Sequence, residues 1–272
     1  MSAPSFSFLG QAVIAAPSFV WPAHIAENCR RLAPLVDEVG LLFLESDACL
    51  AYTEQDLPGF LAQTGLRFHV HLPLDLPWNS GPEKVWEIVA GLRSKAAFLR
   101  PGAFVLHPPP MRNGPTGDRR WNPHDCPPLK NGVVFSHTDD CLRLFVQFWE
   151  EAGARPEELL LENTRENDLI ALQPLIQSRN LGICLDLGHL LAYGQRTHLL
   201  PEIWPRVKMV HLSAPGPQGQ HRSLRELDES GRSLLREILN RLKPGCILMI
   251  EVFDPDGFKE SLHMLKTMTS RP

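Results

Sequence analysis

The sequence predicts an α/β protein that folds as one parallel (β/α)8 TIM barrel. Short apolar segments alternate with longer amphipathic segments from one end of the chain to the other. The short segments are apolar throughout, as expected for parallel strands that are covered on both faces. The chain length of 272 residues also suits eight strand–helix units, because a barrel of this type usually takes about 250 residues.

Eight apolar segments of strand length are expected to form the barrel wall. Each is followed by a segment with helical periodicity, and Pro82 suits the first turn of its helix because its missing N–H is not needed there. The expected strands are residues 8–15, 39–45, 67–73, 103–109, 158–163, 182–188, 206–213 and 246–253. The expected helices are residues 24–36, a stretch from about 54, 82–99, 138–153, 167–177, a stretch from about 189, 223–242 and 257–268.

The alternation is interrupted once, after the fourth expected strand. Residues 108–136 are rich in Pro, Gly and Asn and have no periodicity. No other change in composition divides the chain, so we expect residues 1–272 to form a single domain with 108–136 as a loop insertion over the C-terminal face. A long loop in that place is better suited to a lid or a substrate wall than to a linker.

The overall composition narrows the classes of function. The formal net charge of −4 and the pI near 6.3 argue against binding to a nucleic-acid backbone but not against a phosphorylated small molecule. The six cysteines have no CxxC or disulfide-like spacing, which favours a cytoplasmic location. No apolar stretch reaches the roughly 18 residues of a membrane span, and the oligomeric state is left open.

Four acidic or imidazole side chains stand at the expected ends of consecutive strands. They occur in the segments LLLEN, ICLDLG, MVHLS and LMIEVF. Because parallel strands in a barrel end at the same rim, these side chains should converge there and enclose a divalent ion. The four predicted ligands are Glu162, Asp186, His211 and Glu251.

Further imidazoles fall at the same rim, which predicts more than one ion. His189 follows Asp186 by three residues across a strand-to-helix turn. A site so rich in histidine favours zinc, or a mixture of zinc, manganese and iron, over magnesium alone. His69 points to the same side of its strand as His71 but is deeper, so we expect it to pack or to support the ligands. The additional predicted ligands are His71, His107, His189 and His221.

Several polar residues near the rim are candidates for substrate binding. Glu45 ends the second expected strand and either binds substrate or accepts hydrogen bonds from loop amides. Arg119 and Trp121 in the insertion, and Arg222 beside His221, either bind a phosphate and stack on a ring or lie in solvated loops. The sequence contains neither a glycine-rich phosphate loop nor a GxSxG nucleophile motif.

The strand-end motifs carry a resemblance that covers nearly the whole chain. LLLENT, CLDLGH, VHLS and LMIEVF together resemble the xylose-isomerase-like, apurinic-endonuclease-type barrel superfamily. In its endonuclease branch three metals are bound, and the resemblance implies the same role for the eight residues named above. That branch has an Asp two residues before the last histidine, where this chain has Gly219.

Within that superfamily the chain is similar to the CbiR-type cobamide-remodelling phosphodiesterases. The similar segments are RLAPLVDEVGLLFLES, HVHLPLDL, CLDLGHLLAYG, HRSL and IEVF. The resemblance implies a corrinoid substrate whose nucleotide loop is hydrolysed at the phosphoribosyl linkage, so that the lower ligand is exchanged. In that group an acid tends to precede the last histidine directly, where this chain has Gln220.

These observations lead to a hypothesis of metal-assisted phosphodiester hydrolysis with two catalytic glutamates. Glu162 bridges two ions, and Glu251 is either a ligand or the group that orients the attacking water. One alternative is a sugar isomerase or epimerase that uses one ion and the same two glutamates as an acid–base pair. Repair of abasic DNA and a non-catalytic corrinoid or metal carrier are the others. The number of bound ions separates the first two, since the isomerase needs only one.

Overall fold

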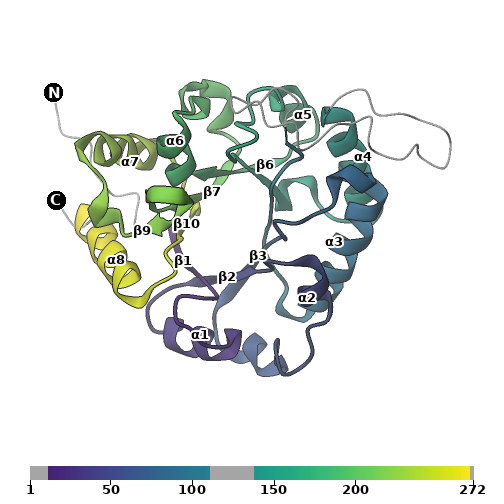
Figure 1. The fold of residues 1–272 in the computed structure, drawn as a ribbon, viewed down its shortest axis with the longest axis horizontal. Helices are drawn as coiled ribbons and strands as arrows, with labels where there is room; N and C mark the ends of the chain where they lie inside the picture. Colours follow the sequence, from purple (N-terminus) through teal and green to yellow (C-terminus); the bar gives the residue numbers. More distant parts are fainter. Residues whose placement is uncertain (1–11, 111–137, 270–272) are drawn as a thin grey trace.

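The protein folds as the predicted (β/α)8 barrel. The structure is a computed structural model that describes residues 12–110 and 138–269. Eight parallel strands form a closed ring in the order β1-β10-β7-β6-β5-β4-β3-β2, and helices surround it (Figure 1). The strands are β1 (Val13–Pro17), β2 (Glu38–Leu42), β3 (Arg67–His71), β4 (Phe104–Leu106), β5 (Leu159–Glu162), β6 (Gly182–Asp186), β7 (Val207–Leu212) and β10 (Ile247–Ile250).

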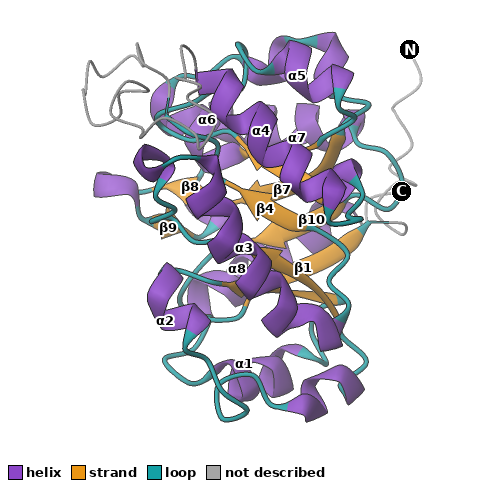
Figure 2. Ribbon diagram, turned by 90° about the vertical axis from the view of Figure 1, so that its right-hand side faces the viewer, coloured by secondary structure: helices purple, strands orange, loops and turns teal. Residues whose placement is uncertain are grey.

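The helices pack on the outside of the strands, as the view along the side of the barrel shows (Figure 2). Two of them begin at an aspartate cap: Asp186 accepts a hydrogen bond from the His189 amide at 2.5 Å, and Asp228 accepts one from the Gly231 amide at 2.7 Å. The helices are α1 (Ile25–Leu32), α2 (Ser46–Leu50), α3 (Pro82–Ala96), α4 (Thr138–Glu151), α5 (Gln173–Ser178), α6 (Leu187–Tyr193), α7 (Glu229–Arg241) and α8 (Pro255–Thr269).

The helix predicted from about residue 54 is wrong. Instead α2 starts eight residues earlier, at Ser46, and a short 3₁₀ helix forms at Gly59–Gln63. Between them the Asp56 carboxylate accepts hydrogen bonds from the Thr53 amide at 2.8 Å and the Thr53 hydroxyl at 3.0 Å. Such local side-chain bonds, followed by Pro58, stabilise a turn in competition with a helix.

The helix predicted over 167–177 is shorter than expected for a similar reason. The Asn167 side chain accepts a hydrogen bond from the Leu169 amide at 3.0 Å, and Leu169 has a φ of 65°. This left-handed conformation is incompatible with the α-helix, so α5 starts only at Gln173. The residues before α5 form a loop at the rim of the barrel.

A two-stranded antiparallel hairpin that the sequence did not predict follows β7. It consists of β8 (Ala214–Pro215) and β9 (His221–Arg222). Gly219 lies in its turn with a φ of 80°, a conformation that glycine adopts at no steric cost. Only after a 3₁₀ helix at Leu224–Glu226 does α7 begin, so the helix predicted over 223–242 is shorter at its start.

The main hydrophobic core lies between the strands and the surrounding helices, with smaller apolar clusters inside the barrel. Cys184 and Met209 belong to one of the interior clusters and are fully buried. The cysteines that the structure describes are all free thiols. No helix in the described ranges is long and apolar enough to cross a membrane.

Candidate metal centre

All eight predicted metal ligands lie at the C-terminal rim of the barrel. His71, Glu162, Asp186 and His211 belong to β3, β5, β6 and β7, and Glu251 directly follows β10. Parallel pairing sets the height of these side chains, since Asp186 is in register with His211. His107 directly follows β4, while His189 is on α6 and His221 on β9.

The first group of ligands consists of Glu162, Asp186, His211 and Glu251. Each offers one ligand atom, and these atoms all lie within 4.8 Å of one another. The His211 Nδ1 is 3.1 Å from Glu251 Oε2, 3.5 Å from Glu162 Oε1 and 3.8 Å from Asp186 Oδ2. All four side chains are buried, so three carboxylates and an imidazole share one small region.

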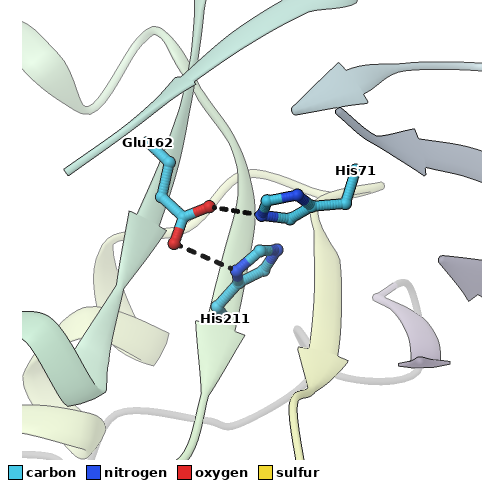
Figure 3. A group of neighbouring side chains, drawn as sticks. All are labelled: His71, Glu162 and His211. Carbon is cyan, nitrogen blue, oxygen red and sulfur yellow. Dashed lines mark hydrogen bonds and ion pairs between the residues drawn. The ribbon is translucent and has the colours of Figure 1, made fainter. Parts of the chain in front are cut away.

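The second group of ligands, His71 and His107, lies near the other carboxylate oxygen of Glu162, Oε2. His71 Nε2 is 3.1 Å and His107 Nε2 is 3.4 Å from Glu162 Oε2. Figure 3 shows the Glu162 carboxylate between His71 on one oxygen and His211 on the other. Glu162 is therefore placed to bridge two sites, one on each carboxylate oxygen.

Backbone carbonyls determine which ring nitrogens of two histidines are available. His71 Nδ1 donates to the Leu72 carbonyl at 2.9 Å, and His189 Nδ1 donates to the Asn163 carbonyl at 2.8 Å. In a neutral ring the proton on Nδ1 leaves Nε2 as a lone-pair donor. The His71 Nε2 therefore faces a carboxylate oxygen, an arrangement that requires either a proton or a metal ion between the two.

His221 completes the rim from the unpredicted hairpin. Its Nδ1 is 3.5 Å from Glu251 Oε2 and 3.3 Å from the Ser213 hydroxyl. Its ring also packs edge-on against Phe253, with the ring centroids 5.3 Å apart. The hairpin thus brings a nitrogen ligand to Glu251 from outside the barrel wall.

Asn163 supports the ligands and was not recognised in the sequence. Its side chain accepts a hydrogen bond from the Asp186 amide at 2.7 Å and donates to the Asp186 carbonyl at 3.1 Å. It also donates to Gln195 at 2.8 Å, and its own carbonyl orients His189. The signal that was available is its place directly after Glu162, where a carboxamide can bond to the backbone of the next strand.

Unpaired buried atoms test whether a cation fits this site. Within the described residues, both ring nitrogens of His211, Asp186 Oδ2 and Glu251 Oε2 are buried and form no hydrogen bond. Each unsatisfied buried polar atom usually costs about 1–3 kcal/mol. A divalent ion would satisfy the two carboxylate oxygens and one ring nitrogen of His211, and a donor set of imidazole nitrogen and carboxylate oxygen suits zinc, manganese or iron.

The pKa values of the cluster are shifted by the close approach of imidazoles and carboxylates. Burial favours the neutral form of Glu251, but His211 and His221 outweigh it and lower its pKa to about 2. Burial likewise opposes ionisation of Glu162, yet His211 and His107 hold its pKa well below the usual range. The pKa of His211 is raised well above its usual value, because Cys184, Glu251 and Glu162 surround it and outweigh its burial. The surrounding carboxylates therefore favour the protonated form of His211.

A cavity of about 340 Å³ opens above the ligands. Its polar part is formed by His71, His107, Glu162, His189, His221 and Glu251, and its apolar part by Phe19, Leu42, Leu44, Leu74 and Phe253. The size is within the usual range of small-molecule sites. A reacting group at the ligands would thus be surrounded by hydrocarbon on its other sides.

Of the predicted substrate-binding residues, the two that the structure describes do not line this cavity. Glu45 is exposed and precedes α2, and it does not line the cavity. Arg222 does not line it either, and its guanidinium pairs with Glu226 at 3.4 Å. Arg119 and Trp121 lie outside the described residues. The exposed part of the apolar wall, formed by Leu44, Leu74 and Phe253, was not recognised because apolar side chains in loops have no periodic pattern.

Comparison with known proteins assigns the family. Residues 37–268 match the family model described as xylose isomerase-like TIM barrel, and the chain belongs to this family. No curated protein sequence matches the chain.

Solved structures of low sequence identity share the fold. A D-tagatose 3-epimerase-like protein is 19% identical with a TM-score of 0.65, over 94% of this chain and 96% of that one. Endonuclease IV from Thermus thermophilus is 18% identical with a TM-score of 0.60, over 94% and 98%. The IolI protein, whose structure contains a zinc atom, is 11% identical with a TM-score of 0.61, over 95% and 96%.

Proposed function

We propose that the protein is a metal-dependent phosphodiesterase that opens the nucleotide loop of a cobamide at its phosphoribosyl linkage. The observation that carries the hydrolytic part is the position of Glu162, whose two oxygens face two different groups of ligands. Hydrolysis of phosphodiesters commonly uses paired ions, whereas a sugar isomerase needs one. The cobamide substrate is supported by the sequence segments that resemble the CbiR-type enzymes.

Each ion would be bound by a distinct part of the rim. Glu162 Oε1, Asp186, His211 and Glu251 would bind one, and Glu162 Oε2 with His71 and His107 would bind the other, with His189 and His221 beside them. When bound, such ions lower the pKa of coordinated water and neutralise the charge of a phosphate. Glu162 is the shared ligand, so its loss would affect both sites.

The protein's own groups would orient the reaction. Glu251 is ionised at neutral pH, since its pKa is about 2, and it can accept a hydrogen bond from the attacking water. The water oxygen forms a bond to phosphorus while the bond from phosphorus to the ribose oxygen breaks, and a water proton passes to that oxygen. The products are a ribazole-type nucleoside and a cobinamide phosphate.

A sugar isomerase or epimerase is the second candidate, and one observation favours it. The four-ligand group is sufficient for one ion without any of the additional histidines, and Glu162 and Glu251 would then act as the acid–base pair. The similarity to a D-tagatose 3-epimerase-like protein agrees with this role. In that case His71 and His107 would have no necessary part in catalysis.

The first experiment tests the reaction and the bond broken. Protein reconstituted separately with zinc, manganese or iron is incubated with adenosylcobalamin, and the products are identified by mass spectrometry. We expect a ribazole-type nucleoside and a cobinamide phosphate. Intact cofactor at every metal loading would contradict the proposal, and a panel of keto- and aldo-sugars would then test the isomerase.

A pair of variants separates the two candidates. The double substitution His71→Asn, His107→Asn removes one group of ligands but leaves the four-ligand group intact. For the phosphodiesterase we expect loss of turnover and of at least one bound ion, measured by mass spectrometry of metal content. His263→Asn is the matched control, because His263 is exposed on α8. Unchanged turnover in the double variant would favour the single-ion candidate.

A further inference from the structure

Exposed apolar side chains surround the mouth of the cavity above the ligands. Leu44 is 46% exposed, Leu74 is 57% exposed and Phe253 is 42% exposed, and all three line this cavity. They come from the loops after β2, β3 and β10. Apolar side chains gathered at a rim usually mark a contact surface for a ligand. We call Leu44, Leu74 and Phe253 the apolar rim.

A second cavity of about 530 Å³ adjoins the first. Leu74 and His107 line both cavities, so one continuous cleft passes the His107 side of the candidate metal centre. The second cavity is bounded by the loop after β3, the residues after β4, and Thr164 and Glu166 after β5. A monosaccharide would need only the space directly at the ligands, whereas this cleft suits a longer substrate.

The chemistry of the second cavity differs from that of the first. Its polar lining includes Asp75, Thr164 and Glu166, and none of its described lining residues is Lys or Arg. Asp75 shapes the wall by accepting hydrogen bonds from Ser46, at 2.9 Å from the amide and 2.7 Å from the hydroxyl. Glu166 is exposed and forms no ion pair with a described residue. A hydroxyl-bearing neutral or cationic group suits these acceptors, and a second anion does not.

We propose that the substrate lies across both cavities in one orientation, with a broad apolar half on the apolar rim and a hydroxyl-bearing half beside Glu166. This inference rests on the proposed function, because the phosphodiester must lie between the halves, next to His107. In a cobamide the corrin ring is the broad half and the ribose with its base is the hydroxyl-bearing half. The first cavity is too small to enclose a macrocycle, so the ring would rest on the exposed rim.

The two products of the reaction allow each half to be tested separately. Binding of cobinamide phosphate and of the ribazole nucleoside to the zinc-loaded protein is measured by isothermal titration calorimetry, without any turnover. Leu44→Asn removes apolar area from the rim, and Glu166→Gln removes a charged acceptor from the second cavity. Leu199→Asn is the control, since Leu199 is 49% exposed and lines neither cavity.

We expect a crossed pattern, in which each of the two variants weakens the binding of a different product. Leu44→Asn lowers the affinity for cobinamide phosphate about fivefold or more, because part of a leucine contact is lost. The affinity for the nucleoside is unchanged. Glu166→Gln lowers the affinity for the nucleoside about tenfold, because a hydrogen bond to a charged group is lost. The affinity for cobinamide phosphate is unchanged. Leu199→Asn changes neither affinity. Unfolding temperatures of all three variants establish that they are folded.

The outcomes separate this inference from the proposed function. A reversed pattern, or equal effects of each variant on both ligands, would overturn the orientation even if adenosylcobalamin is hydrolysed. The crossed pattern without hydrolysis at any metal loading would support the orientation and overturn the proposed function. If the unaltered protein binds neither product and hydrolyses no cobamide, both are overturned.

Discussion

Two histidine–carboxylate clusters lie inside the barrel and differ in whether their polar atoms are paired. The deeper one joins His69 to Glu38, with Nδ1 2.7 Å from Oε1, and His69 Nε2 is 3.2 Å from the Met249 sulfur. The cluster at the rim surrounds His211, whose Nδ1 lies near three carboxylates and whose two ring nitrogens form no hydrogen bond. The same residue types thus form a closed pair in one place and an open ligand set in the other.

Packing reinforces this difference between the clusters. A Cβ added to Gly40 would lie 2.5 Å from His69 Nε2, so the backbone of β2 closes directly over that ring. The rim cluster instead faces a cavity of about 340 Å³. A buried polar pair with all its atoms satisfied contributes to the fold, whereas unpaired buried atoms beside a cavity indicate a binding site. Each prediction below tests that distinction.

The largest effect is expected at the ligand that both metal groups share. Glu162→Gln keeps the size of the side chain but removes its charge, so binding of both ions should weaken. Because loss of mere supporting residues costs about 10–100-fold in affinity or activity, we expect turnover to fall by roughly a hundredfold or more. Glu202→Gln is the control, because Glu202 is an exposed residue of the 3₁₀ helix Pro201–Ile203. Initial rates of adenosylcobalamin hydrolysis are measured for both variants. An active Glu162→Gln protein would refute the bridging role.

Removal of metal should destabilise the protein by an amount that depends on the affinity of the folded state for the metal. At a free metal concentration of about 100 times Kd, binding to the folded state alone contributes roughly 2.7 kcal/mol per site. A chelator should therefore lower the free energy of unfolding by that amount, as measured by urea denaturation. In the double variant His71→Asn, His107→Asn the effect should be smaller, because one group of ligands is missing. An equal loss in both proteins would argue for a single ion.

Opposite effects on folding and metal binding are expected for the two clusters. Glu38→Gln weakens the bond to His69, and we expect a loss of about 1–3 kcal/mol of unfolding free energy with unchanged metal affinity. Asp186→Asn should reduce metal affinity by about tenfold or more.

The metal-free Asp186→Asn protein should be as stable as the unaltered one. Burial already raises the pKa of Asp186, and asparagine is an equally good helix cap for α6. Denaturation without metal and metal titration together measure these effects. Strong destabilisation of metal-free Asp186→Asn would show that the rim cluster is structural.

The smallest expected effect is the release of a proton when metal binds. The pKa of His211 is raised well above its usual value in the metal-free cluster, so the ring is protonated at neutral pH and must lose that proton to bind a metal. Metal affinity should therefore rise with pH, by about tenfold per unit for one proton, until the raised pKa is reached. Calorimetric titrations in buffers of different ionisation enthalpy measure the proton released. Binding without proton release near pH 7 would contradict this protonation state.

The sequence alone determined the barrel and the height of the ligands on its strands. Apolar segments of strand length that alternate with helical segments indicate parallel strands covered on both faces, and the polar residue that ends each segment then reaches the common rim. Glu162, Asp186 and His211 follow from this rule, and His211 Nδ1 lies within ion-pair distance of both carboxylates. The limits of α2 and α5 did not follow, because local side-chain bonds at Asp56 and Asn167 stabilise turns where the periodicity suggests helix.

Only the tertiary structure decided how residues distant in the chain meet. His69 and His71 share a strand face, but pairing of β3 with β2 places Glu38 near His69. Closure of the barrel places Glu162 of β5 near His71. The hairpin that carries His221 and the loops that bring Leu44, Leu74 and Phe253 to one cavity have no periodic signal. Loop conformation and contacts across the barrel depend on long-range packing, whereas strand periodicity is a local property that the sequence displays directly.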